Sequence, residues 1–403
     1  MFKKILLPTD GSEIAAGAIQ VAVDLANSLH GDLHRVRFCS TRTGGTLVGS
    51  LRDDIELDIL GRTSPWAIKP LLQLARIVDE HEIDVIHSHG RGSMKFVALA
   101  RALRLVRAKH VFHDHFAAGA LQSSATLDLR VPMQHQVDAY LGVDARLCAW
   151  ACDMAGVDPE RTYLVRSGVD LERFDDAAPI DLRERLAFDG DRFIVANIAN
   201  FRPQKDHPTL FRAIAELPED FQRRLLVVLV GSTTADASYH ASCMEMVQSL
   251  GIEGSVAVFG ESDDAPGVLA AAHAALLSSK NETGPLVVLE YMASGLPFIA
   301  TDTGEITHAV RDLGVGFVTT PRDHRALADA LTTLLTMSDE ERQAMGSLGR
   351  QVAAETFDQR LVTRSVCQVY EVLLGLRDQP DLLRSVAEAR RDAGRPAAAA
   401  LRG

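Results

Sequence analysis

The sequence predicts an α/β protein with two domains, each a doubly wound parallel sheet covered by helices. The chain has 403 residues, which is too long for one ordinary hydrophobic core and suits two domains of usual size. Short apolar runs alternate with amphipathic runs along nearly the whole chain, and this alternation is typical of parallel sheets with helices on both faces. Hydrophobic residues make up 47% of the chain and charged residues 24%, as in ordinary globular proteins.

The first half of the chain begins with a short apolar run at residues 5–8, which we expect to be the first strand. A polar turn and an amphipathic helix over residues 18–27 follow it. The same order then repeats. We expect further strands at residues 33–38, 55–60, 85–86, 111–112 and 163–165, and further helices at residues 66–80 and 94–105.

The second half repeats the theme, with a strand at residues 193–197, a polar turn and a helix from Pro208. Residues 225–230 are all apolar, which is typical of a strand that is buried on both faces. We expect further strands at residues 256–259, 274–277 and 297–300, and a late amphipathic helix at residues 363–374.

A polar connector near residues 175–190 marks the boundary between the two domains. We therefore expect a first domain over residues 1–178 and a second domain over residues 179–360. A C-terminal helix over residues 361–378 is a candidate to cross back to the first domain. Residues 379–403 turn to Ala, Arg and Pro, so an irregular tail is expected there.

The formal net charge of −12 argues against a nucleic-acid partner, because binding to a phosphate backbone needs a basic face. The chain has no run of 18 apolar residues, and its first residues lack the long apolar region of a signal peptide. We therefore expect a cytoplasmic protein.

Basic residues cluster along one expected helix and its exit, over residues 91–109. They are Arg91, Lys95, Arg101, Arg104, Arg107 and Lys109. A solvated helix face is one interpretation of this pattern. The other is a docking face for an anionic lipid or a sugar-phosphate acceptor, which would place the protein peripherally at the inner membrane face.

The segment from Glu282 to Thr301 carries the strongest functional pattern in the chain. Pro285 suits the first position of a helix, because the N–H that it lacks has no acceptor there. Gly295 supplies a left-handed residue just past the helix end, and Pro297 prevents continuation. The helix between them is mostly apolar and should be buried against a sheet, yet it contains Glu290. Because burying a carboxylate is costly without a partner, Glu290 should have a polar one.

The start of this helix is suited to phosphate, because its first N–H groups are unpaired and its dipole is positive there. A phosphate at the helix tip and hydroxyl groups at the two carboxylates are what a nucleotide-sugar site requires. The alternative is a buried structural helix with a solvated Glu282 and an ion-paired Glu290.

A second candidate element, Arg202 and Lys205, follows the expected strand at residues 193–197. Two cations three residues apart, in a turn before a helix, can grip both phosphates of a diphosphate. Ligands in such sheets bind beyond the carboxyl ends of strands, where this turn lies. Two exposed loop cations are the alternative.

The spacing Glu-x7-Glu within E-T-G-P-L-V-V-L-E-Y-M-A-S-G-L-P closely resembles the signature of the retaining family 4 glycosyltransferases, also called glycosyl transferases group 1. The resemblance extends to about residue 375 and is weakest at the start of the chain. It implies the GT-B fold, in which two Rossmann-like domains face a central cleft. It also implies metal-independent transfer of a sugar from a nucleoside-diphosphate sugar, with retention of configuration and no further cofactor.

The resemblance also implies roles for residues of the second domain. Arg202 and Lys205 match the family's Arg-x-x-Lys element, which binds the donor diphosphate and stabilises the leaving nucleotide. Glu290 would bind the ribose hydroxyls, and Glu282 would lie near the donor sugar. The donor diphosphate would meet the backbone of Gly284, Pro285, Leu286 and Val287.

In the first domain, His113 matches the family's strand-end histidine, which contacts the donor sugar and helps to shape the reaction centre. Gly11 and Ser12 match a glycine loop near the acceptor, although this chain has one glycine where the family usually has two. The pairs His87/His89 and His113/His115 could suggest a metal. No carboxylate cluster for a nucleotide-bound Mg²⁺ is visible, so we expect no metal site.

The function predicted from the sequence is transfer of a sugar to a saccharide or lipid-linked acceptor by front-face displacement. Three alternatives share the fold. A glycoside phosphorylase would use the two cations for free phosphate. A GT-B epimerase would need further acid and base carboxylates, and a nucleotide-sugar sensor would bind the donor without turnover.

Overall fold

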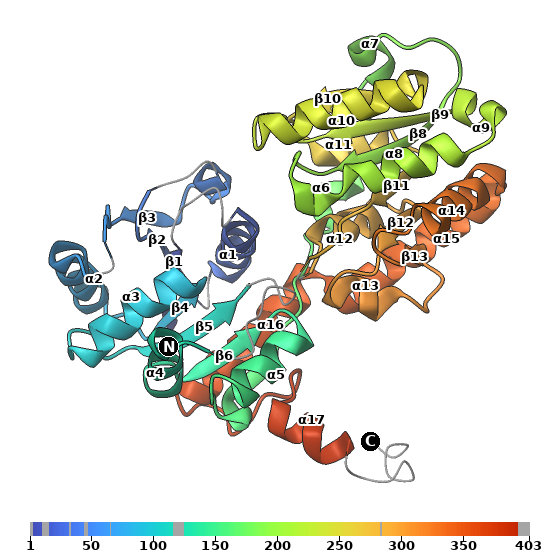
Figure 1. Ribbon diagram of the computed structural model, residues 1–403. Coiled ribbons are helices and arrows are strands. Elements are labelled where there is room, and N and C mark those ends of the chain that lie inside the picture. Colours follow the sequence, from blue (N-terminus) through green and yellow to red (C-terminus); the bar gives the residue numbers. More distant parts are fainter. Residues whose placement is uncertain are drawn as a thin grey trace. The chain divides into compact units, whose positions relative to one another are not determined.

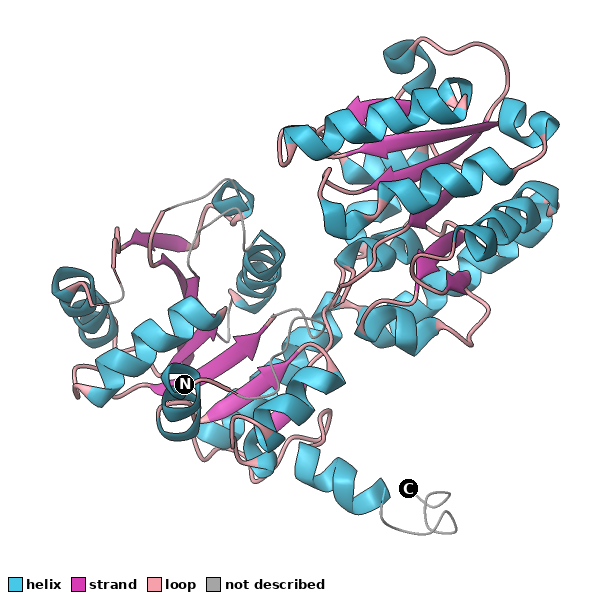
Figure 2. Cartoon of the chain, viewed as in Figure 1, coloured by secondary structure: helices cyan, strands magenta, loops and turns pink. Residues whose placement is uncertain are grey.

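The computed structural model describes residues 3–9, 16–31, 34–43, 47–64, 66–115, 125–282 and 284–393. The chain divides into two compact units (Figure 1). The first unit combines residues 1–168 with residues 359–403, and the second comprises residues 169–358. Each unit has its own parallel sheet with helices packed on both faces (Figure 2).

The sheet of the first unit has seven strands in the order β3-β2-β1-β4-β5-β6-β7, and all of its pairings are parallel. Its strands are β1 (Lys3–Thr9), β2 (His34–Ser40), β3 (Glu56–Ile59), β4 (Val85–His89), β5 (Lys109–Asp114), β6 (Ala139–Gly142) and β7 (Thr162–Leu164).

Helices cover both faces of this sheet. They are α1 (Ala16–Leu29), α2 (Ile68–Glu80), α3 (Arg91–Ala102), α4 (Leu127–His135), α5 (Ala145–Asp153), α16 (Gln359–Leu373) and α17 (Val386–Ala393). Successive strand residues point to opposite faces, so Ile5 packs with Val23 of α1 and Tyr370 of α16, whereas Leu6 packs with Leu74 of α2. The late helix α16 is thus part of the first unit's core.

The sheet of the second unit has six parallel strands in the order β10-β9-β8-β11-β12-β13. They are β8 (Phe193–Ile198), β9 (Leu225–Val230), β10 (Val256–Gly260), β11 (Ala274–Leu277), β12 (Phe298–Thr301) and β13 (Phe317–Thr319). Every residue of β9 is buried, as its unbroken apolar sequence predicts.

The helices of the second unit are α6 (Glu172–Asp175), α7 (Leu182–Leu186), α8 (His207–Glu216), α9 (Glu219–Arg224), α10 (Ala237–Leu250), α11 (Ala265–Ala270), α12 (Leu286–Ala293), α13 (Glu305–Val310), α14 (His324–Thr336) and α15 (Asp339–Val352). Helix α12 packs on one face of the sheet, where Leu289 joins the cluster of Val228. Helices α8 and α14 pack on the other face, around Val227.

The expected strand at residues 85–86 is longer in the structure, because β4 pairs with β5 as far as His89 opposite His113. The helix expected over residues 94–105 is α3, which begins at Arg91 and ends at Ala102. Arg104 follows it with a left-handed φ of 59°. The longer strand places His87 and His89 on β4, and the earlier start of the helix places Arg91 on α3, whereas Arg104 lies outside it.

The chain leaves the first unit about ten residues before the expected boundary at residue 178. The N–H of Val169 donates to the carbonyl of Phe357 at 2.8 Å, and this bond attaches residue 169 to the second unit. Residues 386–393 form helix α17, where the composition predicts an irregular tail. Ser385 and Glu388 bond to each other's backbone N–H, at 3.2 and 2.7 Å, in a capping box that starts this helix.

Among the described residues, no helix is both long enough and apolar enough to cross a membrane.

Candidate active site

The Arg202 turn and the Glu282 loop follow two neighbouring strands of the second unit. Strand β8 leads to the turn and β11 leads to the loop, and the two strands are hydrogen-bonded to each other in the sheet. The carboxyl ends of parallel strands lie at the same sheet edge, where ligands bind in such folds. The structure therefore brings together two elements that the sequence places about 80 residues apart.

Lys205 and Glu282 form an ion pair at this edge. The Nζ atom of Lys205 lies 2.6 Å from Oε1 of Glu282. Their side chains retain 22% and 19% of their exposure, so the pair is mostly buried but reachable from solvent. The hydroxyl of Ser279 donates to the same Oε1 atom at 2.8 Å. Glu282 is thus oriented by both a cation and a hydroxyl.

The backbone holds the two elements together as well. The N–H of Lys280 donates to the carbonyl of Gln204 at 2.8 Å, and the hydroxyl of Ser278 donates to the carbonyl of Lys205 at 2.9 Å. The hydroxyl of Thr301, at the end of β12, donates to the carbonyl of Ser279 at 2.5 Å. Three neighbouring strand ends therefore fix the position of the Lys205–Glu282 pair.

Arg202 lies three residues before Lys205, with extended backbone, at the start of a short turn of 3-10 helix over Pro203–Lys205. Its side chain is half-buried. Within the part of the chain that the structure describes, its guanidinium makes no ion pair or hydrogen bond. Its five N–H donors are available to an anion, in the planar arrangement that suits a phosphate.

Helix α12 follows the Glu282 loop directly. Its first residue is Leu286, and Pro285 lies one position before the helix rather than in it. The N–H groups of Leu286 and Val287 belong to the first turn, which has no intrahelical acceptor for them. Gly284 lies beside Ile306, which a Cβ at this position would approach to 3.5 Å. Thr283 lies outside the described residues.

Tyr291 anchors helix α12 to the sheet. Its hydroxyl donates to the carbonyl of Leu276 at 3.0 Å and accepts from the N–H of Ile198 at 3.3 Å. Glu290 precedes it on the helix and is half-buried rather than fully buried. The end of the helix is as predicted, because Gly295 has a φ of 66° just before Pro297. The helix therefore presents Glu290 from a rigidly held position.

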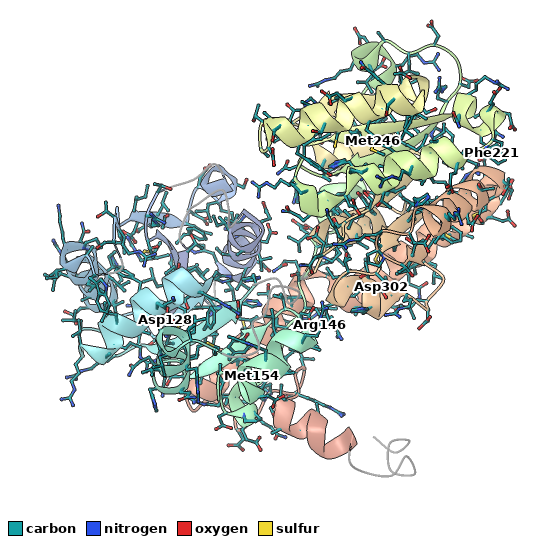
Figure 3. All side chains as sticks on the ribbon, in the orientation of Figure 1. Asp128, Arg146, Met154, Phe221, Met246 and Asp302 are labelled. Atoms are coloured by element: carbon teal, nitrogen blue, oxygen red, sulfur yellow. The ribbon has the colours of Figure 1, made fainter. Side chains whose placement is uncertain are left out.

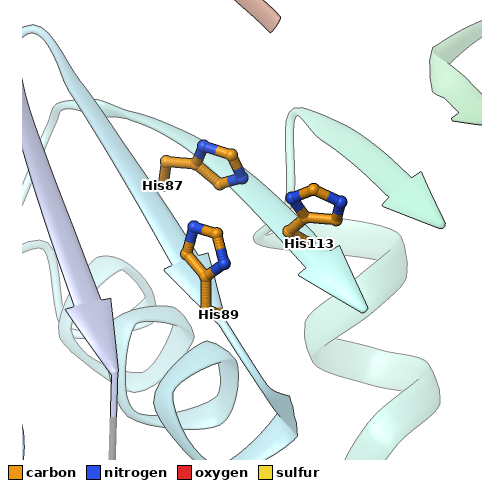
Figure 4. A group of neighbouring side chains, drawn as sticks. All are labelled: His87, His89 and His113. Carbon is orange, nitrogen blue, oxygen red and sulfur yellow. The ribbon is translucent and has the colours of Figure 1, made fainter. Parts of the chain in front are cut away.

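In the first unit, His113 lies on β5 and is almost fully buried, beside His87 and His89 (Figure 4). The ring centroid of His115 lies 4.3 Å from that of His113. Burial lowers the pKa of His113 to about 3. The nearby backbone of Val165 has a smaller effect that raises the pKa. Burial and the neighbouring imidazoles also lower the pKa values of the other three histidines. All four rings are therefore neutral at physiological pH.

Gly11 and Ser12, the expected acceptor-side residues, lie outside the described residues. Sequence reasoning did not identify Ser278, Ser279 or Tyr291 as parts of the site. The signal for the two serines is their place directly after the buried strand β11, at the edge where ligands bind.

Three of the six basic residues over residues 91–109, those on α3, pair with carboxylates. Arg91 bonds Asp114 at 3.0 Å and Arg101 bonds Asp138 at 2.6 Å. Lys95 bonds Asp128, which lies on α4 (Figure 3). These pairs favour the interpretation of α3 as an ion-paired surface helix over that of a free basic docking face.

A hollow lined by Arg183, Arg192 and His273 lies in the second unit. His273 precedes β11 and Arg192 precedes β8, so the hollow is at the amino-terminal edge of the sheet. That is the edge opposite Lys205 and Glu282, and the predicted site residues do not line it.

Two family models match consecutive parts of the chain. The model described as Glycosyltransferase Family 4 matches residues 15–173, and the model described as Glycosyl transferases group 1 matches residues 180–352. They cover most of the first unit's sheet and nearly all of the second unit.

Curated relatives include two bacterial enzymes. The chain is 29% identical over 314 residues to the D-inositol 3-phosphate glycosyltransferase of Nocardioides sp., covering 71% of this chain and 67% of that protein. It is 29% identical over 194 residues to the N-acetyl-alpha-D-glucosaminyl L-malate synthase of Bacillus anthracis. That match covers 48% of this chain and about half of the relative, 49%.

Among solved structures, Anabaena HepE in complex with UDP-glucose has a TM-score of 0.75 with this chain at 21% identity. The likeness covers 93% of this chain and 100% of that one, and it shows a shared fold. With two parallel-sheet units and both family models matched, the chain belongs to the family 4, group 1 glycosyltransferases and has their two-domain GT-B fold.

Proposed function

We propose that the protein transfers a sugar from a nucleoside-diphosphate sugar to an acceptor hydroxyl, with retention of configuration and without a catalytic metal. The observation that carries this proposal is the Lys205–Glu282 ion pair of 2.6 Å, held between neighbouring strand ends and followed directly by the start of helix α12. It places cations, a carboxylate and unpaired backbone N–H groups at one sheet edge.

The diphosphate of the donor would bind Arg202, Lys205 and the first turn of α12. An ammonium has three N–H donors, so Lys205 can keep its bond to Glu282 while it donates to a phosphate oxygen. Arg202, which has no partner among the described residues, can donate two parallel bonds to the other phosphate. Negative charge grows on the diphosphate as the nucleotide leaves, and fixed donors at that place stabilise the transition state.

Glu282 would face the donor sugar. Its Oε1 atom accepts from Lys205 and Ser279, and within the described residues its Oε2 atom makes no hydrogen bond. That oxygen is available to a sugar hydroxyl. The negative charge also lies close to where the sugar acquires positive character. Glu290, one turn into α12, would accept hydrogen bonds from the ribose hydroxyls. His113 of the first unit would contact the donor sugar.

In the proposed reaction the bond between the anomeric carbon and the diphosphate oxygen breaks. The acceptor oxygen forms its bond to that carbon on the same face, and the acceptor proton passes to the leaving diphosphate. Configuration is therefore retained and no protein nucleophile is needed. Support comes from the matched motif and from the relatives, which include a glycosyltransferase and a protein solved in complex with UDP-glucose.

The test combines binding and turnover. Thermal shifts with UDP-glucose, UDP-N-acetylglucosamine and GDP-mannose would identify the donor, because a ligand of the folded state raises its stability. The preferred donor is then incubated with saccharide and lipid-linked acceptors, and the anomeric configuration is read by NMR. An inverted product contradicts the proposed mechanism.

Two controls separate the alternatives that share the fold. Turnover that requires inorganic phosphate would indicate a glycoside phosphorylase. A large thermal shift without transfer to any acceptor and without donor hydrolysis would indicate a nucleotide-sugar sensor.

A further inference from the structure

Three histidines of the first unit lie on one face of two neighbouring strands. His87 and His89 are two residues apart on β4, so both point to the same face. His113 on β5 lies directly opposite His89 in the parallel register. Figure 4 shows the three rings gathered above these strands. One ring nitrogen from each residue lies within 4.8 Å of the other two.

Each of the three histidines has a buried ring nitrogen that makes no hydrogen bond to the described residues. In the part of the chain that the structure describes, Nε2 of His87, Nε2 of His89 and both ring nitrogens of His113 are buried and make no hydrogen bond. The residues are 0%, 2% and 1% exposed. Burying a polar atom without a partner is unfavourable, so several such atoms in one place point to a ligand that binds there.

The Nδ1 atoms of His87 and His89, the two histidines of β4, do have hydrogen-bond partners. Nδ1 of His87 lies 2.6 Å from the hydroxyl of Tyr370, and Nδ1 of His89 lies 3.1 Å from Nε2 of His115. Metal-binding histidines typically bond an outer partner through one nitrogen and present the other to the metal. His87 and His89 have this arrangement.

We propose that His87, His89 and His113 bind a divalent transition metal of the kind that favours imidazole, with Zn²⁺ as the ion to test. Zinc binds ring nitrogens at about 2.0–2.1 Å, which holds them about 3.4 Å apart in a tetrahedral site. The three nitrogens must therefore approach one another by at most about 1.4 Å, which small ring rotations supply. The fourth position of a three-histidine site stays open to water.

The bound metal would inhibit transfer, and this consequence rests on the proposed function, in which His113 contributes to the reaction centre. A ring nitrogen that coordinates zinc no longer has its lone pair free, and the ring is held in the coordinating orientation. Zinc bound at this site would therefore inhibit the enzyme, and a chelator would reverse the inhibition. Binding itself does not depend on the glycosyl transfer proposal.

The test measures metal binding first. Chelator-treated and desalted full-length protein is titrated with ZnCl₂ by calorimetry, and with CoCl₂ by visible absorption, which reports tetrahedral coordination. We expect one saturable site. His89→Asn and His113→Asn should each weaken zinc binding by more than about 100-fold. Tyr370→Phe, which removes only the outer hydroxyl, should weaken it by about 10- to 100-fold.

The matched control is His135→Asn, because His135 is exposed on α4 and outside the cluster. It should bind zinc like the wild type. The proposal is overturned if the wild type shows no saturable site, or if His89→Asn and His113→Asn bind like the control. Should these variants fail to fold, the cobalt spectrum of the wild type and the affinity of Tyr370→Phe decide. If the protein binds zinc but its transfer rate does not change when zinc is added, only the inhibitory role is refuted.

Discussion

Lys205 and Glu282 are 77 residues apart in the chain and form a 2.6 Å ion pair, to which the hydroxyl of Ser279 adds a second bond on the same carboxylate oxygen. Because both side chains are mostly buried, removing one partner leaves the other poorly solvated. The pair therefore links the proposed diphosphate contact to the proposed sugar contact, and its two members should respond differently to substitution.

Arg202→Ala and Lys205→Ala should each lower kcat by about 10²-fold, the usual cost of removing one transition-state donor. Donor binding should weaken less, because charge on the diphosphate grows mainly as the nucleotide leaves. Steady-state kinetics with the preferred donor measure this. Arg223→Ala is the control, because Arg223 is exposed on α9 away from the site. Near wild-type rates in both variants would show that the diphosphate assignment is wrong.

Glu282→Gln and Glu290→Gln should differ in kinetics. Glu290 is assigned to the ribose, which is bound alike in the ground and transition states, so its variant should mainly raise the KM for donor. Glu282 is assigned to the reacting sugar, so its variant should mainly lower kcat. Both variants must first match the wild-type melting curve without ligand. The reverse pattern would mean that the two roles are exchanged or mistaken.

Ser279→Ala should lower kcat by about 10-fold without a matching rise in the KM for donor, because the hydroxyl positions Glu282 and does not touch the donor. Ser279→Thr retains a hydroxyl and should recover part of the rate. Ser242→Ala is the control, because Ser242 is exposed and its hydroxyl donates to the carbonyl of Ser238 in its own helix. A rise in KM alone would indicate that Ser279 contacts the donor directly.

Transfer should survive exhaustive EDTA treatment, because Arg202, Lys205 and the start of α12 supply the positive charge at the diphosphate. If zinc binds the three histidines as proposed, chelation should raise the rate of zinc-loaded protein. The measurement compares initial rates before and after EDTA and desalting. A rate that falls with EDTA and returns only with Mg²⁺ or Mn²⁺ would contradict the proposed mechanism.

Stability should fall with acid, because burial lowers the pKa values of His110 and His207 to about 4. Below about pH 6.5, the pKa of a histidine in the unfolded chain, these side chains are protonated in the unfolded state but stay neutral in the folded protein. The stabilisation is therefore full above pH 6.5 and is lost as the pH falls towards 4, by up to about 1.4 kcal/mol per pH unit for each histidine.

Urea denaturation between pH 7.5 and 5 measures this slope. His207→Gln should reduce the number of protons that the chain takes up on unfolding by about one over this pH range. An unchanged slope in His207→Gln would show that this imidazole titrates normally in the folded protein.

The sequence by itself determined the fold class and the local secondary structure around the candidate site. Helix and strand periods are properties of neighbouring residues, so the apolar run of β9 and the amphipathic helix α16 could be predicted. Gly295 and Pro297 mark the end of α12 because backbone conformation at these residues is set locally. Glu282, Glu290, Arg202 and Lys205 could be singled out because their spacing carries a motif.

Only the tertiary structure decided which of these groups meet. The Lys205–Glu282 pair exists because β8 and β11 are adjacent in the sheet, and strand order is not encoded in any local pattern. The histidine cluster depends on the register of β4 against β5, which places His89 opposite His113. The ion pairs of Arg91, Lys95 and Arg101 likewise form because α3 packs beside elements that carry the matching carboxylates. Contacts between distant residues follow from the packing of whole elements, which the spacing within one element cannot reveal.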